Sequence, residues 1–222
     1  PHHYINGQRV ASAERFDLHC PIDQSLLGQV SEGTAAHVDA AITAAQAAFP
    51  AWAALTAAER KPYLDRFAAE IGKRSEAFCQ VESNDAGILL SRMQHGVVPR
   101  AMLNLTWFAE HALMLQDRPI ETEQATHIVR HDPAGVVVII TPWNSPLMLA
   151  TWKLGPALAA GNTVIVKPPE WAPLTSSLLA DCAHAAGLPP GVFNIVQGSG
   201  ANTGAKLVSD PRLARVSFTG SV

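Results

Sequence analysis

The stretch that decides the fold runs from Gly135 to Glu170 and reads GVVVIITPWNSPLMLATWKLGPALAAGNTVIVKPPE. Two apolar runs in it, Gly135–Ile140 and Thr163–Val166, have the length and the β-branched composition of buried strands. An apolar helical pattern over about Pro146–Leu158 lies between them. Strand, helix and strand in this order predict a βαβ unit, whose parallel strands end at one edge of a sheet.

The alternation of strands and helices continues to the end of the sequence. It predicts, in order, a helix over about Pro173–Ala186, a strand at Val192–Val196, a helix over about Asn202–Ser209 and a strand at Arg215–Phe218. This order predicts an α/β fold, in which helices flank a parallel sheet and the crossovers are right-handed. Ligands of such sheets bind at the carboxyl ends of the strands.

The first half of the sequence is mainly helical in pattern. It predicts a hairpin that turns at Asn6-Gly7, a short strand at Gly28–Val30, a helix from Thr34 that Pro50 ends, a helix opened by the capping box Thr56–Glu59, a helix over Ser75–Gly87 and a long helix over Val98–Leu115. The polar segment Gln116–Asp132 changes character and alternates around His127–Arg130. We expect either an extended arm or a small separate sheet there.

Composition argues against several classes of protein. The net charge is -3, from 16 basic and 19 acidic residues, and no basic stripe favours a nucleic-acid partner. No apolar run approaches the roughly 20 residues of a membrane span, and the first residues lack a signal-peptide pattern, so we expect a cytoplasmic protein. The 3 cysteines form no CxxC pair, and no histidine cluster has the spacing of metal ligands, so we expect no metal.

Each predicted strand ends in polar or glycine-rich residues, which packing alone does not explain. The first strand is followed by Thr141–Asn144, the second by Lys167 and Glu170 and the third by Gly198–Gly204, and the end of the fourth contributes Ser217–Ser221. A carboxylate beside a lysine suits ribose hydroxyls and disfavours a 2′-phosphate. The glycine segment resembles a nucleotide-binding loop but is not GxGxxG, and its glycines also fit a tight turn.

Asn144 is the candidate for a role in the reaction itself. Its side-chain N–H can donate to a developing oxyanion, although an asparagine after a strand can equally satisfy a turn. The same sequence resembles the aldehyde dehydrogenase superfamily over its whole length. The motifs TPWNSPL, TWKLGPALAAGNTVIVKPPE, GLPPGVFNIVQGSG and SFTGS carry this resemblance, and they agree with the family in order and spacing.

The resemblance implies a Rossmann-like domain that binds NAD, with NADP disfavoured by Glu170, and a cysteine that attacks an aldehyde to form a thiohemiacetal. Matched by position, Asn144 is the oxyanion donor, and Leu149 and Trp152 line the aldehyde tunnel. The cofactor contacts implied are Thr141, Pro142, Trp143, Lys167, Pro169, Glu170, Gly200, Gly204, Phe218, Thr219, Gly220 and Ser221.

The resemblance also implies a division of the chain. Residues 1–116 and 133–222 correspond to the cofactor-binding domain, and residues 117–132 to part of an oligomerisation arm of a homodimer or homotetramer. The family's nucleophilic cysteine and general-base glutamate lie in GQxC-like and ELGGK-like segments, which would follow Val222. We therefore expect an N-terminal part, truncated before the catalytic domain, that does not oxidise aldehydes alone.

Arg100, at the start of the long helix, is similar to an arginine of the muconic semialdehyde branch that meets a substrate carboxylate. A guanidinium suits a carboxylate because it can bind both oxygens, yet a surface role explains Arg100 equally well. Two other readings of the whole chain remain open. One is a non-catalytic nucleotide-binding or scaffold module of the same fold, and the other is an acylating or phosphorylating relative that uses CoA or NADP.

Overall fold

A six-stranded sheet forms the centre of the protein, which is a computed structural model describing residues 1–115 and 117–220. The strand order is β10-β7-β8-β9-β1-β2. Four strands of this sheet are parallel to one another, namely β7 (Val136–Ile140), β8 (Thr163–Lys167), β9 (Phe193–Ile195) and β10 (Arg215–Phe218). The predicted α/β fold with a parallel sheet and flanking helices is confirmed.

The N-terminal hairpin extends this sheet in the antiparallel sense. Strands β1 (His3–Ile5) and β2 (Gln8–Val10) pair with each other, and Tyr4 pairs with Ile195 of β9. The turn between them uses Asn6 and Gly7, both with positive φ, as the sequence predicted.

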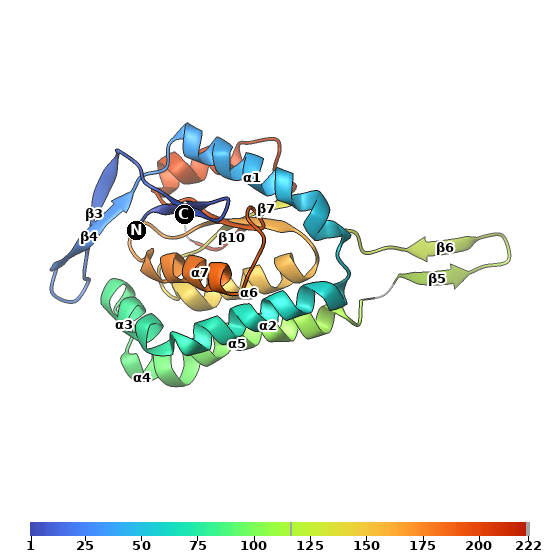
Figure 1. The fold of residues 1–222 in the computed structure, drawn as a ribbon, viewed down its shortest axis with the longest axis horizontal. Coiled ribbons are helices and arrows are strands. Elements are labelled where there is room, and N and C mark those ends of the chain that lie inside the picture. The colour runs from blue at the N-terminus through green and yellow to red at the C-terminus, as the bar shows by residue number, and fades with distance from the viewer. Residues whose placement is uncertain (116, 221–222) are drawn as a thin grey trace.

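Helices cover both faces of the sheet, in one layer on one face and in two layers on the other (Figure 1). Helices α1 (Ala35–Ala54) and α8 (Ala205–Val208) lie on one face, and the crossover helices α6 (Pro146–Ala159) and α7 (Leu174–Ala185) lie on the other. Helices α2 (Ala57–Lys73) and α5 (Val98–Ala112) pack against α6 and α7 from outside. The buried hydrophobic residues form two clusters, one on each face of the sheet, because neighbouring residues of a strand point to opposite faces.

The remaining elements lie at the two ends of the molecule. Helix α3 (Ser75–Ala86), helix α4 (Leu90–Arg92) and the π-helical turn η1 (Met93–Val97) connect α2 to α5. Two separate hairpins are formed by β3 (Arg15–His19) with β4 (Leu26–Ser31), and by β5 (Arg118–Glu121) with β6 (Thr126–Val129). The β5–β6 hairpin projects away from the body, so the polar segment is a small separate sheet (Figure 1).

The structure corrects two local predictions. Pro50 does not end its helix, because α1 continues to Ala54. The extra turn buries Trp52, whose Nε1 donates to the carbonyl of Leu158 at 3.2 Å, so tertiary packing outweighs the lost backbone bond. The helix expected from Asn202 begins instead at Gly200, as the π-helical turn η2 (Gly200–Gly204) ahead of α8.

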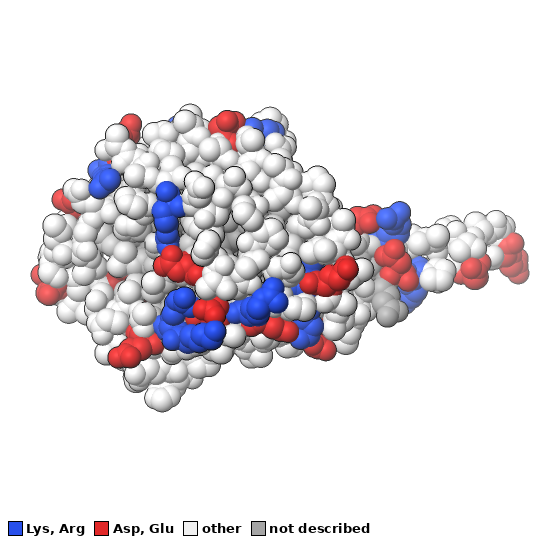
Figure 2. All heavy atoms as spheres, viewed as in Figure 1, with Lys and Arg blue, Asp and Glu red and all other residues white. Residues whose placement is uncertain are grey.

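Charges of both signs are mixed on the surface. On the face drawn in Figure 2, basic side chains lie beside acidic ones. Ion pairs of this kind join Arg9 to Asp181 and Glu70 to both Lys73 and Arg74. No helix among residues 1–115 and 117–220 has the length and apolarity needed to cross a membrane.

Candidate functional site

The carboxyl ends of three parallel strands meet in register at one edge of the sheet. Ile140 at the end of β7 pairs with Lys167 of β8 on one side and with Phe218 of β10 on the other. Two backbone bonds extend this alignment past the strands, from the N–H of Thr141 to the carbonyl of Lys167 (3.3 Å) and from the N–H of Thr219 to that of Ile140 (3.1 Å). The polar residues that follow these strands are thereby brought together.

A cavity of about 480 Å³ opens at this edge. Its lining contains Asn144 and most of the residues that the resemblance implied for the cofactor. These lining residues are Thr141, Pro142, Trp143, Asn144, Leu149, Lys167, Pro169, Glu170, Gly200, Phe218, Thr219 and Gly220, together with Ile140 and Trp171. Gly204, Arg100 and Trp152 do not line it, and Ser221 lies outside the described residues.

Lys167 and Glu170 form an ion pair beside the cavity. The Lys167 side chain is buried, and its Nζ lies 3.1 Å from Oε2 of the half-exposed Glu170. Burial lowers the pKa of Lys167, and the neighbouring carboxylate of Glu170 partly opposes this effect. Gly204 lies against the same lysine, because a Cβ atom at Gly204 would stand 3.8 Å from Lys167 Cδ.

The Thr141–Asn144 loop lines the cavity next to this pair. The side chains of Trp143 and Asn144 are exposed, whereas Thr141 is buried. The Thr141 hydroxyl has no hydrogen-bond partner among the described residues. A buried polar atom without a partner is costly, so a ligand that bonds to this hydroxyl would be favoured.

The glycine segment after β9 already holds a carboxylate. Glu32, which precedes α1, accepts hydrogen bonds from the N–H of Ser199 (3.2 Å), the side-chain N–H of Asn202 (3.3 Å) and the hydroxyl of Thr203 (2.9 Å). A helix N-terminus that binds a side-chain carboxylate no longer offers these donors to a phosphate. The donors of Ser199, Asn202 and Thr203, in the segment that resembles a nucleotide-binding loop, are thus used within the protein.

Glu32 was not among the residues predicted from the sequence. It lies far from Ser199 in the chain and precedes a helix that Thr34 already caps, so no local pattern indicates its partner. This contact leaves no room for a side chain at Gly198, because a Cβ atom there would stand 2.8 Å from Glu32 Oε1 and 2.1 Å from the Thr203 hydroxyl.

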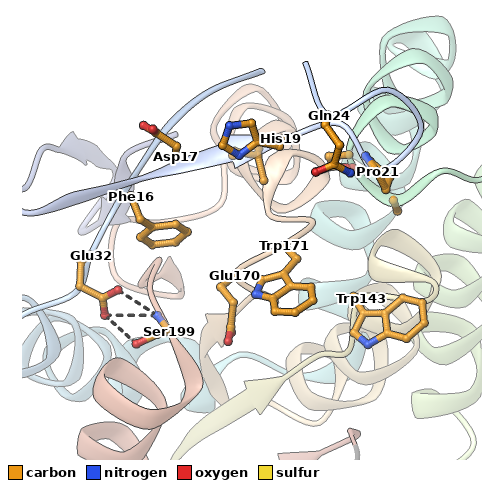
Figure 3. A pocket seen from close by; sticks show the side chains of 13 residues that line it. Phe16, Asp17, His19, Pro21, Gln24, Glu32, Trp143, Glu170, Trp171 and Ser199 are labelled. Carbon is orange, nitrogen blue, oxygen red and sulfur yellow. Dashed lines mark hydrogen bonds between the residues drawn. The ribbon is translucent and has the colours of Figure 1, made fainter. Parts of the chain in front are cut away.

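A second cavity of about 750 Å³ adjoins the first and shares Trp143, Glu170 and Trp171 with it. It lies between the β3–β4 hairpin and the loops that follow β7 and β8 (Figure 3). Phe16 comes from the hairpin side, and the bonds of Glu32 to Ser199 stand at the margin of the cavity (Figure 3). This cavity could not be predicted from the sequence pattern, because the β3 strand on one side of it was not predicted.

Arg100 and Trp152 lie together but outside both cavity linings. The guanidinium carbon of Arg100 is 5.3 Å from the centre of the Trp152 ring, which is a cation–π contact. Arg100 Nε also donates to Oδ1 of Asn104 at 3.0 Å. The Nδ2 atom of Asn104 in turn donates to the carbonyl of Met148 at 3.2 Å. Arg100 remains exposed and is oriented by α5 and α6 together.

The three cysteines are free and buried, and none lines either cavity. Burial raises the pKa of Cys182 to about 12 and also raises that of Cys79. Because the thiolate is the nucleophilic form, these two thiols are poor nucleophiles near neutral pH. The cavity of these described residues thus contains a hydrogen-bond donor, Asn144, without a thiol beside it.

Comparison with known proteins identifies the family of this chain. The profile of the aldehyde dehydrogenase family matches residues 9–222. Two relatives from Pseudomonas species are a 2-hydroxymuconic semialdehyde dehydrogenase (strain CF600), 41% identical over 98% of this chain and 47% of its own, and a 2-aminomuconic 6-semialdehyde dehydrogenase, 38% identical over 98% and 46%.

A solved structure of PnpE in complex with nicotinamide adenine dinucleotide superposes with a TM-score of 0.95 at 38% identity, and a structure of PnpE from Pseudomonas sp. WBC-3 gives the same values. The match covers 99% of this chain and 46% of that one. The chain therefore spans about half the length of the relatives that it matches. On the match over residues 9–222, this chain belongs to the aldehyde dehydrogenase family.

Proposed function

We propose that this chain forms the cofactor-binding half of an NAD-dependent aldehyde dehydrogenase, which oxidises an aldehyde to its carboxylic acid. The observation that supports this most is a single cavity that holds the Lys167–Glu170 pair and Asn144 at adjoining strand ends. The pair suits the ribose of a dinucleotide, and Asn144 suits a reacting oxygen. The 222-residue chain on its own is proposed to be inactive, because its cysteines are buried away from Asn144.

The residues of the cavity fit NAD. A volume of about 480 Å³ falls within the usual range for small-molecule sites. Glu170 would accept hydrogen bonds from ribose hydroxyls, Lys167 would donate to them, and the orphaned Thr141 hydroxyl would gain a partner. A 2′-phosphate would meet the charge of Glu170 at close range, so NAD is preferred over NADP. When bound, NAD supplies the hydride acceptor for the oxidation.

Asn144 is proposed to donate its side-chain N–H to the aldehyde oxygen as negative charge develops there. Such a donor stabilises the oxyanion that forms when a thiolate attacks the carbonyl carbon and the C=O electrons move to oxygen. The attacking cysteine of this thiohemiacetal step, and the glutamate that activates water to release the acid, would come from outside these 222 residues. Leu149 lines the cavity beside Asn144 and is proposed to contact the aldehyde.

The substrate is proposed to be an aldehyde that also bears a carboxylate. The two relatives described above are semialdehyde dehydrogenases, and Arg100 offers a guanidinium already oriented by Trp152 and Asn104. A carboxylate can bind both N–H groups of the free guanidinium edge, which favours Arg100 and Trp152 as substrate contacts.

We further propose that the protein assembles as a homodimer or homotetramer through the β5–β6 hairpin, residues 117–132 being part of this arm. The hairpin supports this because it exposes Ile120, Ile128 and Val129 on a two-stranded sheet that projects from the body.

A cytoplasmic location is proposed from the three unpaired cysteines, since free thiols are typical of a reducing compartment.

The test is an assay of the protein expressed from its complete gene, with NAD and a panel of neutral aldehydes and semialdehydes. We expect NADH formation to be fastest with semialdehydes. Saturable NAD binding without oxidation of any aldehyde would favour a non-catalytic nucleotide-binding module. Absence of NAD binding would contradict the proposal altogether.

A further inference from the structure

Helix α3 buries two acidic side chains, although carboxylates normally stay at the surface unless paired. Glu82 is fully buried and Asp85 is 2% exposed. They stand three positions apart, which places them on the same side of the helix. No cation pairs with either among the described residues, and one oxygen of each carboxyl accepts a backbone N–H while the other has no partner there.

Glu82 caps the crossover helix that follows β7. The N-cap residue of α6, Ser145, makes no side-chain capping bond within residues 1–115 and 117–220, and Pro146 has no N–H to offer. Leu147 therefore provides the first free N–H of α6, and it donates to Glu82 Oε2 at 3.0 Å. The helix after the Thr141–Asn144 loop takes its cap from α3 rather than from its own sequence.

Asp85 does the same for the crossover helix that follows β8. The N-cap position of α7 is Pro173, whose side chain has no acceptor atom. The N–H of Leu174, the first residue of α7, donates to Asp85 Oδ2 at 2.8 Å. Asp85 also lines the larger cavity beside Glu170 and Trp171, so its contact lies close to the Lys167–Glu170 loop.

We propose that Glu82 and Asp85 are positioning residues, which hold the two cavity loops at a fixed separation by capping both following helices from one rigid helix. The loops 141–145 and 168–173 each end at one of these caps. Glu82 fixes the loop that presents Asn144, and Asp85 fixes the loop that presents Glu170. The inference deepens the proposed function, because the effect on catalysis requires that the cavity hold the cofactor.

Burial sets the protonation of this pair. It raises the pKa of Glu82 to about 8 and that of Asp85 to about 7, while the backbone N–H bonds oppose the rise. A negative charge is thus not required for the caps near neutral pH, only an acceptor oxygen. Amide variants, which keep such an oxygen, should retain the caps.

The direct test is amide hydrogen exchange at Leu147 and Leu174, measured by NMR in the protein from its complete gene. The variants Glu82→Met and Asp85→Leu remove the acceptor at similar side-chain volume, and Glu76→Ala on the exposed side of α3 is the control. We expect Glu82→Met to speed exchange at Leu147 at least about fivefold with little change at Leu174, and Asp85→Leu to do the reverse. Equal effects on both amides, or no effect, would overturn the proposal.

Kinetics of the same variants test the consequence for the cavity. Glu82→Met should lower kcat about 10- to 100-fold with an unchanged Kd for NAD, and Asp85→Leu should raise the Kd for NAD. A global loss of stability would not affect kcat in one variant and the Kd for NAD in the other. If the exchange results hold but these separate effects on kcat and Kd are absent, the positioning role is wrong. If the unmodified protein neither binds NAD nor oxidises aldehydes, the proposed function fails while the exchange results still decide the capping.

Two amide variants keep the proposal testable if an apolar variant fails to fold. Glu82→Gln and Asp85→Asn should keep the exchange rates of Leu147 and Leu174 within about twofold of the unmodified protein, because each preserves one acceptor oxygen. Should Glu82→Met or Asp85→Leu fail to fold, these two variants decide the matter, since loss of protection in them would contradict the proposal.

Discussion

The Nζ atom of Lys167 lies 3.1 Å from the Oε2 atom of Glu170 at the carboxyl end of β8. Lys167 is buried while Glu170 is partly exposed, so the carboxylate is the member of the pair that a ligand meets first. The pair has no net charge and can both donate to and accept from a diol. This arrangement suits a ribose with free hydroxyls better than one with a phosphate.

Replacement of Glu170 by Gln should therefore weaken NAD binding and reduce discrimination against NADP. A hydrogen bond to a charged group contributes about 1.5–3 kcal/mol, which corresponds to a rise in the Kd for NAD of about tenfold or more. Titration with NAD and NADP would measure both constants. An unchanged ratio of the two Kd values would show that Glu170 does not select the ribose.

Replacement of Asn144 by Ala should reduce catalysis without affecting the cofactor. Loss of one oxyanion donor typically lowers kcat by about 10²–10³-fold. The Kd for NAD serves as the internal control, because Asn144 is proposed to contact the aldehyde oxygen alone. A fall in NAD affinity with normal kcat would contradict this assignment.

Replacement of Arg100 by Ala should raise KM for acidic aldehydes about tenfold or more and leave neutral aldehydes nearly unchanged, because only the former lose a charged contact. Arg100→Lys should be intermediate, since it keeps the charge but not the two-pronged geometry. Arg92→Ala is a control at another exposed arginine. Equal changes for both classes of aldehyde would exclude a carboxylate contact.

Glu82 should make stability depend on pH. Its pKa in the folded protein is about 8, against an ordinary value of 4.5, because of burial. Between these values the unfolded chain has released the proton while the folded protein retains it, so the free energy of unfolding should fall by a few kcal/mol as pH rises through this range.

The check is thermal unfolding of the protein and of Glu82→Gln from pH 5 to pH 8. In Glu82→Gln, stability should depend less on pH than in the unmodified protein. The dependence that remains should reflect Asp85, whose pKa is also raised. Glu76→Gln, which removes an exposed carboxylate of the same helix, should leave the dependence intact. A parallel dependence in the protein and in Glu82→Gln would contradict the raised pKa.

Much of the fold was predictable because its signals are local. Buried strands such as Thr163–Val166 are continuous β-branched runs, and the capping box is visible in the sequence and forms as expected, with the Thr56 N–H 2.7 Å from Glu59 Oε2. Strand ends also predict where polar groups gather, since the register of parallel strands follows from the βαβ order.

What the sequence could not show depends on contacts between distant segments. Pro50 remains inside α1 because Trp52 is buried against α6, and Glu32 reaches Ser199 from the other end of the chain. Likewise, Glu82 and Asp85 have the spacing of ordinary exposed residues on a helix, and only the structure shows that both are buried and cap other helices.

The most direct test of the account is a calorimetric titration of the protein from its complete gene with NAD. We predict one saturable site with a Kd between about 1 μM and 1 mM, weakened about tenfold or more in Lys167→Met. The exposed Lys73 lies on α2, outside the cavity lining, so Lys73→Met should bind as the unmodified protein does. No saturable binding, or equal binding by the Lys167→Met variant, would contradict a cofactor site at the end of β8.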